Sequence, residues 1–453
     1  MWPLANVGRI PEPPVEAERL APDGALFILV SFEGPDPYSQ AGGLGVRMTG
    51  LAHALVDLDY ETHQFFIGDP DLPPLQVGAE GRLSLHRWSQ WISANCRGGV
   101  YDGEAGKVHD VTTSLPPYLV EEILTPAIHA GRVPVVLFEE WQTAECACRV
   151  SDALEALGVR DCARLAWNAN HCYGFDRIDW RRLGASVSIT TVSRHMRSIV
   201  RACGTDARVI PNGIPSAALA PVARREVAAI RSSVAERPGT GLFFKMARWE
   251  REKGWTQALD AVAQARAGDR RLMLVARAGG PTGAGGELER DATQRRLNVV
   301  TSRSERDFFS DIGEAVRSDA DVVDLRFGVS PALARSLFAA ADGVLANSVS
   351  EPFGLVGLEA MAAGGVAYTG GTGEDYAIGG HNAVVLETLD PAEIVQRSTE
   401  LASSPDVASR IRRRAKKTAQ DYEWNTVVGL LINALAPRGD AIGAPWASQV
   451  VTA

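Results

Sequence analysis

Two glutamates after one predicted strand are the residues of this chain whose type and spacing most clearly suggest chemistry. Residues 350–355 read Ser-Glu-Pro-Phe-Gly-Leu, and the helix predicted to begin there carries Glu359. Helical side chains lean toward the helix N-terminus, so Glu359 is expected near the same helix end as Glu351. Two carboxylates there could hold two hydroxyl-bearing parts of one ligand, such as the hexose and the ribose of a nucleotide sugar. One surface glutamate plus one helix-capping glutamate is the alternative.

A pair of cations, Arg248 and Lys253, forms a second candidate group. Both lie on the loop that follows a strand predicted at 242–246. Arginine supplies a planar fork of donors and lysine a compact charge, so the two could hold a diphosphate leaving group from two sides. A solvated charged loop is the alternative interpretation.

A glycine-rich turn, residues 40–45, forms a third candidate and reads Gln-Ala-Gly-Gly-Leu-Gly between a predicted strand and a predicted helix. Gly42 and Gly43 lack Cβ atoms, so their backbone N–H groups could approach a ligand closely. The helix that starts near Gly45 adds its unpaired amides and its positive end, which suits a phosphate. The spacing matches neither G-x-G-x-x-G nor a P-loop, and a structural tight turn is the alternative.

The elements that must position these residues alternate between strand and helix. Continuous apolar runs of strand length are typical of strands buried on both faces of a parallel sheet. Such runs are found in two series, at 25–30, 62–67, 133–138, 163–167, 187–192 and 208–210, and then at 242–245, 272–276, 322–327, 343–346, 366–368 and 383–386. Residues 279–320 are glycine-rich and then charged, which predicts an elaborated surface segment.

This alternation predicts an α/β fold of two doubly wound, Rossmann-like domains with a cleft between them, at the carboxyl ends of the strands. We expect an N-terminal arm at 1–21, a first domain at 22–215 and a second domain at 216–420. Residues 421–453 are expected to form a C-terminal helix and tail that return toward the first domain.

Composition narrows the class of protein. The 453 residues carry 46 basic and 55 acidic side chains, for a net charge of −9, which argues against a general nucleic-acid binder. The six cysteines form no C-x-x-C pair, which favours reduced thiols. No signal peptide is evident, and no apolar run approaches the ~20 residues of a membrane span, so a cytoplasmic protein is expected. The basic run 412–417 is expected to be a solvated helix face, with contact to an anionic membrane surface as the alternative.

The motifs together resemble a known family. Residues 351–364 are similar to the E-x7-E signature of retaining glycosyltransferases with the GT-B fold, closest to family 4 (glycosyl transferases group 1) and the related glycogen and starch synthases. Residues 248–253 resemble the R-x4-K diphosphate clamp of that family. Supporting similarities lie at 42–44, 140–143, 191–193, 209–214 and 337–342, so the resemblance spans about residues 25–430.

The resemblance implies a nucleotide-sugar donor domain at 216–420, after an acceptor domain at 22–215. Glu351 would contact the transferred sugar, Glu359 would bind the ribose, and Arg248 and Lys253 would neutralise the departing diphosphate. Further donor contacts are implied for Gly42, Gly43, Leu44, Phe353, Gly354 and Leu355.

The N-terminal part of the chain departs from the family pattern. Members often have a histidine after one strand of the first domain, where residues 167–171 here read Trp-Asn-Ala-Asn-His. Either Asn168 or His171 would take that catalytic position. Glu140 and Trp141 would lie on the acceptor or sugar side, but a glutamate pair replaces the His-Asp of the glycogen synthases, which puts an α-glucan acceptor in doubt.

The expected function is a retaining, metal-independent transfer of a hexose, expected to be glucose, from an ADP- or UDP-sugar to a carbohydrate or small-molecule acceptor, without a cofactor. Two D-x-D pairs, Asp57/Asp59 and Asp69/Asp71, fit the pattern of metal-dependent transferases. They fall at a helix end and in a proline-rich turn, so we expect no metal site. A non-catalytic nucleotide-sugar-binding protein, or a GT-B enzyme of epimerase- or phosphorylase-like chemistry, is the alternative.

Overall fold

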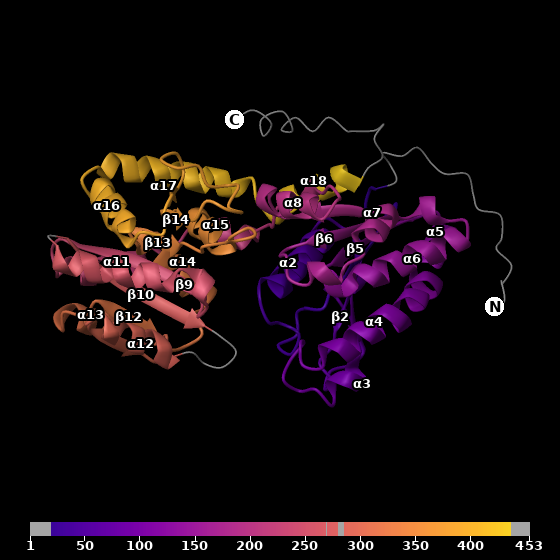
Figure 1. The fold of residues 1–453 in the computed structure, drawn as a ribbon, viewed down its shortest axis with the longest axis horizontal. Coiled ribbons are helices and arrows are strands. Elements are labelled where there is room, and N and C mark those ends of the chain that lie inside the picture. The colour runs from indigo at the N-terminus through magenta and orange to yellow at the C-terminus, as the bar shows by residue number, and fades with distance from the viewer. Residues whose placement is uncertain (1–19, 269, 280–284, 436–453) are drawn as a thin grey trace. The chain divides into compact units, whose positions relative to one another are not determined.

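The computed structural model describes residues 20–268, 270–279 and 285–435 (Figure 1). The chain forms two compact units, residues 1–213 with 424–453, and residues 214–423. The arm predicted before residue 20 and the tail predicted after residue 435 lie outside the described residues. No helix in the described ranges has both the length and the apolar character needed to cross a bilayer.

The first unit is built on a sheet for which eight strands are described, in the order β3-β4-β2-β1-β5-β6-β7-β8. All neighbours are parallel except β3 and β4. The strands are β1 (Ala25–Val30), β2 (Glu61–Ile67), β3 (Leu75–Gly78), β4 (Leu83–Trp88), β5 (Val133–Glu139), β6 (Arg164–Ala169), β7 (Ser188–Thr191) and β8 (Arg208–Val209). Every residue of β1 and β5 is buried, as their apolar runs predict.

Helices cover both faces of this sheet. They are α2 (Gly43–Asp57), α3 (Gln90–Ser93), α4 (Glu104–Tyr118), α5 (Thr125–His129), α6 (Ala144–Ala156), α7 (Trp180–Ser186), α8 (Arg194–Ala202) and α18 (Trp424–Leu435). The last helix, α18, shares an apolar core with α2 and β1. Its first residue, Trp424, packs so closely that a Cβ on Gly50 or Gly213 would lie 2.4 or 2.3 Å from the indole.

The second unit has a parallel sheet of seven described strands in the order β11-β12-β10-β9-β13-β14-β15. The strands are β9 (Thr240–Arg248), β10 (Arg271–Gly279), β11 (Val299–Ser302), β12 (Val322–Leu325), β13 (Gly343–Ala346), β14 (Ala367–Thr369) and β15 (Val384–Val385). The helices are α9 (Ser216–Leu219), α10 (Arg224–Ala235), α11 (Trp255–Ala267), α12 (Gly285–Gln294), α13 (Phe308–Arg317), α14 (Pro331–Ala340), α15 (Leu355–Ala362), α16 (Pro391–Ala402) and α17 (Pro405–Gln420).

The segment 279–320 is more regular than its composition suggests. It contains α12, the edge strand β11 and α13, and apolar side chains such as Leu288 and Ile312 are fully buried. Charged residues therefore cover the outer faces of ordinary βαβ elements.

Parallel strands bring their carboxyl ends to one edge of each sheet. In the second unit the loops after β9, β13 and β14 carry the candidate site, and in the first unit the loops after β1, β5 and β6 do so.

Two stacked histidines on β2 and β4 are expected to make the first unit sensitive to acid. The rings of His63 and His86 share a contact of 3.0 Å between Nδ1 and Nε2, and Phe65 stacks on His86. Burial lowers the pKa of His86 to about 3. Below pH 6.5 His86 is protonated in the unfolded chain but stays neutral in the folded chain. Its contribution to the free energy of unfolding is therefore fully present above pH 6.5 and is lost as the pH falls toward 3.

We expect the free energy of unfolding to fall by up to about 1.4 kcal/mol per pH unit below 6.5 for this group. Urea unfolding at pH 7.5 and pH 5.5 measures the difference. His86→Gln should flatten this pH dependence, whereas His109→Gln, which changes an exposed histidine on α4, should leave it unchanged. An equal loss of stability in wild type and His86→Gln would contradict the prediction.

Candidate active site

Lys253 and Glu351 lie on separate loops of the second unit and form an ion pair. Lys253 ends the short 3-10 turn after β9, and its Nζ lies 2.7 Å from Oε2 of Glu351, on the loop after β13. Gly254 follows with φ of +66°, and a Cβ there would lie 2.1 Å from the carbonyl oxygen of Asn347. Only glycine allows the two loops to approach this closely. The structure thus brings together two residues that sequence reasoning placed in one site.

Arg248 does not join this pair. Its side chain is 55% exposed and lies 3.1 Å from Glu250, which is also exposed. Its backbone carbonyl accepts a hydrogen bond from the indole of Trp255, so the end of β9 is held in place while the guanidinium stays in solvent. A ligand anion could therefore recruit Arg248 without breaking a buried contact.

The N-terminus of α15 lies directly after Glu351. Gly354 caps the helix with φ of +81°, and Phe353 is buried against Tyr376. In the described part of the chain, the amides of Phe353, Gly354 and Leu355 have no acceptor. These amides and the positive end of α15 can bind hydroxyl or phosphate oxygens of a ligand.

Glu359 lies in the second turn of α15 and is only partly exposed. Burial raises the pKa of its carboxyl to about 7. Among the described residues its carboxylate has no hydrogen-bond or ion-pair partner. A carboxylate that is desolvated and unpaired is well suited to accept hydrogen bonds from ligand hydroxyls.

Lys245, near the end of β9, was not anticipated from the sequence. Its Nζ is buried and donates to Asn347 Oδ1 at 2.6 Å and to the carbonyl of Leu345 at 3.3 Å. Burial, with the nearby charge of Lys253, lowers its pKa to about 7. Asn347 in turn donates to the carbonyl of Gly254, so Lys245 ties β9 and β13 to the loop of the ion pair. A lysine within an otherwise apolar strand was the available signal.

The glycine-rich turn of the first unit already holds a carboxylate. Oε2 of the buried Glu33 accepts the amides of Ala41, Gly42 and Gly45 at 3.1, 2.9 and 3.0 Å. Its Oε1 accepts the hydroxyl of Tyr101 at 2.8 Å. The phosphate expected at the amide of Gly42 would have to displace this carboxylate.

The next two amides of the turn are differently placed. Those of Gly43 and Leu44 have no acceptor in the described ranges, and the space above Gly43 is open. Of the three residues expected to bind the nucleotide sugar at this turn, Gly43 and Leu44 therefore keep backbone amides that are available to a ligand.

Glu139, at the end of β5, anchors a buried polar network. Its carboxylate receives hydrogen bonds from Arg47 at 3.2 Å, Asn168 at 2.9 Å and Asn170 at 2.5 Å. Arg47 also donates to Oδ1 of Asn212. This network ties together α2, β5, β6 and the segment after β8, so Asn212 is a structural partner of Arg47.

Glu140 has a strained backbone, with φ of 67° and ψ of 168°. Its buried Oε1 accepts the amides of Asn170 and His171, and its Oε2 lies 3.2 Å from Nδ1 of His171. Burial and the neighbouring Glu139 raise the pKa of Glu140. Strain of this kind costs about 1–3 kcal/mol and is concentrated at functional sites.

The structure separates the two residues that compete for the family's histidine position. Asn168 is 3% exposed and both ends of its amide are used, by Glu139 and by Thr190. The side chain of His171 is 39% exposed, so it can reach a ligand. The buried indole nitrogen of Trp141 has no hydrogen-bond partner among the described residues, and the guanidinium of Arg177 lies 4.4 Å from the centroid of the Trp141 ring.

The D-x-D pairs have other partners. Asp59 is paired with Arg82, and Asp71 lies 2.7 Å from Arg97. Within the described residues no group of three or more histidine, cysteine, aspartate or glutamate side chains is arranged to hold a metal ion.

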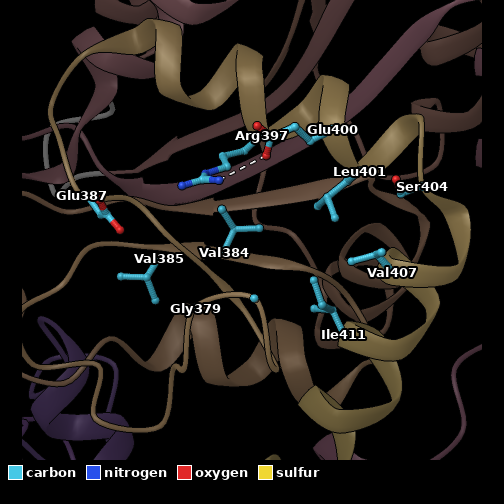
Figure 2. Close-up of a pocket in the computed structure, with 11 residues that line it drawn as sticks. Gly379, Val384, Val385, Glu387, Arg397, Glu400, Leu401, Ser404, Val407 and Ile411 are labelled. Carbon is cyan, nitrogen blue, oxygen red and sulfur yellow. Dashed lines mark hydrogen bonds and ion pairs between the residues drawn. The ribbon is translucent and has the colours of Figure 1, made fainter.

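Two cavities of the second unit differ in their position: one lies beside the Lys253–Glu351 ion pair and the other lies away from it. A cavity of about 510 Å³ borders the loops after β13 and β14, lined by Asn347, Val349 and Thr372 among others. Figure 2 shows a different cavity, of about 470 Å³, lined by Val384, Leu401 and Ile411 with the Arg397–Glu400 pair beside it. The second cavity contains none of the residues expected to be functional.

Residues 316–418 match the family model described as Glycosyl transferases group 1. This segment is a glycosyl transferases group 1 domain. The group 1 domain contains Glu351, Gly354 and Glu359, whereas Arg248 and Lys253 precede it. The ion pair therefore joins a residue of the matched domain to a loop outside it.

Known proteins support the same class. D-inositol 3-phosphate glycosyltransferase from Streptomyces coelicolor is 33% identical over 109 residues, which is 24% of this chain and 24% of that protein. The chain therefore matches about a quarter of the length of this curated relative. The relative and the group 1 domain both support a glycosyltransferase as the class of enzyme.

Solved structures confirm the predicted α/β, GT-B fold. Sucrose-phosphate synthase from Thermosynechococcus elongatus has a TM-score of 0.60 at 16% identity, over 91% of this chain and 99% of that one. The catalytic domain of starch synthase IV from Arabidopsis thaliana, bound to ADP and acarbose, has a TM-score of 0.63 at 16% identity and covers the same shares. An E. coli structure described as trehalose-6-phosphate bound with UDP-2-fluoro glucose has a TM-score of 0.61 at 14% identity, over 90% and 98%.

Proposed function

We propose that this protein is a retaining glycosyltransferase that moves a hexose, glucose first among them, from an ADP- or UDP-sugar to a hydroxyl of a carbohydrate or small-molecule acceptor. The observation that carries the proposal is the Lys253–Glu351 ion pair at the N-terminus of α15. The α15 amides and the carboxylate of Glu359, which have no partner among the described residues, complete the site. Each of these groups matches one part of a nucleotide sugar.

The donor would be bound by groups of the second unit. Glu359 would accept hydroxyls of the ribose, and the amides of Phe353, Gly354 and Leu355 would bind sugar hydroxyls and phosphate oxygens. Lys253 and the exposed Arg248 would meet the charge of the diphosphate. The bound UDP-sugar and ADP of the E. coli and Arabidopsis structures support this donor class.

The chemistry would rest on electrostatic stabilisation of the leaving group. As the bond from the anomeric carbon to the phosphate oxygen breaks, negative charge grows on the diphosphate and positive charge on the sugar ring. Lys253 and the α15 amides are preorganised to stabilise the first charge, and Glu351 the second. The acceptor oxygen would attack the anomeric carbon from the face that the diphosphate leaves and pass its proton to the leaving phosphate oxygen. Because attack and departure occur on the same face, the anomeric configuration is retained.

Acceptor contacts are proposed at Glu140, Trp141 and His171 of the first unit. Glu140 combines backbone strain with a raised pKa, and His171 is the exposed member of the pair it makes with Glu140. Asn168 would act through Glu139 rather than by touching a substrate. A cytoplasmic location is proposed with this activity, and the six free cysteines are compatible with a reducing compartment.

The test is a screen of ADP-, UDP- and GDP-sugars by thermal shift, followed by release of nucleoside diphosphate and mass spectrometry of products with a panel of acceptors. Donor hydrolysis or transfer with ADP- or UDP-glucose is the expected result. Tight donor binding without turnover on any acceptor would favour the non-catalytic binding protein instead.

Activity is expected to persist in excess chelator, and an α-linked donor should yield an α-linked product. Lys253, Arg248 and the α15 amides supply the charge neutralisation for which other transferases use a divalent ion. The two expectations are read separately, by initial rates with EDTA and by the anomeric proton coupling in NMR. Loss of activity in EDTA that Mg²⁺ or Mn²⁺ restores would contradict the first, and a β-linked product would contradict the second.

A further inference from the structure

Glu374 is a buried carboxyl with no part in the proposed transfer. It lies on the loop between β14 and β15 and is 5% exposed. Its Oε2 accepts the amide of Thr372 at 3.1 Å. Its Oε1 is enclosed by protein and has no hydrogen-bond partner in the part of the chain that the structure describes. An enclosed carboxyl with one unsatisfied oxygen is costly to keep, which points to a role beyond packing.

Thr372 connects Glu374 to Glu351. The hydroxyl oxygen of Thr372 accepts the amide of Glu351 at 2.9 Å. The same hydroxyl lies 3.2 Å from the carbonyl oxygen of Glu351 and 3.4 Å from Oε2 of Glu374. Because a hydroxyl has one hydrogen to donate, it serves either the main chain of Glu351 or the carboxylate of Glu374.

Packing brings the two carboxyl side chains close to Gly354. A Cβ on Gly354 would lie 2.8 Å from Cγ of Glu374 and 3.3 Å from Cγ of Glu351. The hydroxyl of Tyr376 donates to the carbonyl of Gly354. The loop of Glu374 therefore holds both Glu351 and the start of α15, which are the parts that would meet the donor sugar.

The charges around Glu374 determine when it ionises. Burial and the nearby Glu351 raise its pKa to about 7. Among the described residues, the titratable groups near this cluster include the phenols of Tyr376 and Tyr422 and the ammonium groups of Lys253 and Lys245, which both interact with the charge of Glu351. Glu374 is thus neutral below about pH 7, and above it adds a second negative charge beside Glu351.

We propose that Glu374 is a positioning residue for Glu351. While Glu374 is neutral, Thr372 donates to the Glu351 carbonyl and holds the Lys253–Glu351 pair at the α15 N-terminus. When Glu374 is charged, the hydroxyl turns to it, and the main chain of Glu351 keeps only the amide hydrogen bond to Thr372, so Glu351 is held less firmly. The effect on the rate rests on the proposed transferase function, but the hydrogen-bond relay does not.

The kinetic test compares kcat against pH for wild type, Glu374→Gln, Glu374→Ala and Thr372→Val. Wild-type kcat should fall about tenfold per pH unit above about pH 7. Glu374→Gln, which is neutral and keeps an acceptor for Thr372, should remove this alkaline limb. Glu374→Ala should also remove the limb, because it removes the acceptor that competes with Glu351 for the Thr372 hydroxyl. Thr372→Val should lower kcat by about 10- to 100-fold with little change in donor KM, because a displaced catalytic group is costly in rate.

Burial also brings the pKa values of Lys245 and Glu359 to about 7. A second comparison therefore tests whether the fall in kcat above pH 7 comes from Glu374 or from Lys245. Lys245→Met should keep the alkaline limb that Glu374→Gln removes. An unchanged pH profile in Glu374→Gln, or a kcat within about twofold of wild type in Thr372→Val, overturns the proposal.

An NMR titration tests the relay without any activity. In protein labelled with ¹³C-methyl threonine, the Thr372 methyl resonance should shift with an apparent pKa near 7 in wild type and stay constant in Glu374→Gln. A methyl that does not titrate, or that titrates alike in both proteins, rejects the relay. If wild type transfers no sugar from any donor, the proposed function fails while this titration still decides the role of Glu374.

Discussion

Lys253→Ala is expected to lower turnover by about 10²–10³-fold while the protein remains folded. Lys253 is the cation that the structure holds in place, through its 2.7 Å contact with Glu351. Its charge is needed most in the transition state, when the diphosphate departs, so kcat should fall more than donor affinity. Initial rates of nucleoside diphosphate release measure the effect, and circular dichroism checks the fold.

Arg251→Ala is the matched control, because Arg251 is an exposed cation in the same short turn. It should leave kcat within about threefold of wild type. Arg248→Ala should also impair turnover, because the variant lacks the guanidinium that we expect a bound diphosphate to recruit. Wild-type turnover in both Lys253→Ala and Arg248→Ala would remove these cations from the mechanism.

In a double-mutant cycle, Lys253→Ala and Glu351→Gln should be non-additive because the two groups are in contact.

Glu359→Ala should weaken donor binding by about 10- to 150-fold, the range expected for one charged hydrogen bond of about 1.5–3 kcal/mol. A ribose contact is similar in the ground and transition states, so kcat should change much less. Glu359 is partly buried on α15, and its carboxylate has no partner in the described part of the chain. Its removal therefore breaks no hydrogen bond or ion pair within that part. Isothermal titration with ADP- and UDP-sugars measures the change.

The pH dependence of donor binding tests the same role. Ligand hydroxyls donate to the ionised carboxylate, and the pKa of Glu359 is about 7, so affinity should improve as the pH rises from 6 to 8. Glu359→Gln should remove that improvement, and Glu236→Ala, which changes an exposed glutamate after α10, should not. A defect in kcat with unchanged donor affinity would place Glu359 at the reacting carbon instead of the ribose.

Local patterns predicted most of the strands. The apolar run at 25–30 is β1 from Ala25 to Val30, and the run at 242–245 lies inside β9. The prediction missed β3 and β4, which lie between the predicted strands at 62–67 and 133–138, and it missed the helix, edge strand and second helix of the segment 279–320. The strand β11 is four residues long and only Ser302 is buried, so its pattern lacks the continuous apolar signal of a central strand.

The sequence by itself determined on which loops the candidate residues lie. The glycines, the cations and the two glutamates follow predicted strands, and in a parallel sheet the carboxyl ends of strands share one edge. Spacing within one loop and one helix was also sufficient to place Glu351 before α15 and Glu359 inside it. These are short-range properties, which the order of residues alone specifies.

Only the tertiary structure decided which side chains meet. Lys253 and Glu351 are brought together by the pairing of β9 with β13, and Gly254 allows the contact. Glu33 occupies amides of the glycine-rich turn because the loop after β1 folds back onto the start of α2. Glu374 faces Glu351 because β13 and β14 are neighbours in the sheet. A carboxylate and its partner attract over a few ångströms in space, whatever their separation along the chain, so no local pattern could report these contacts.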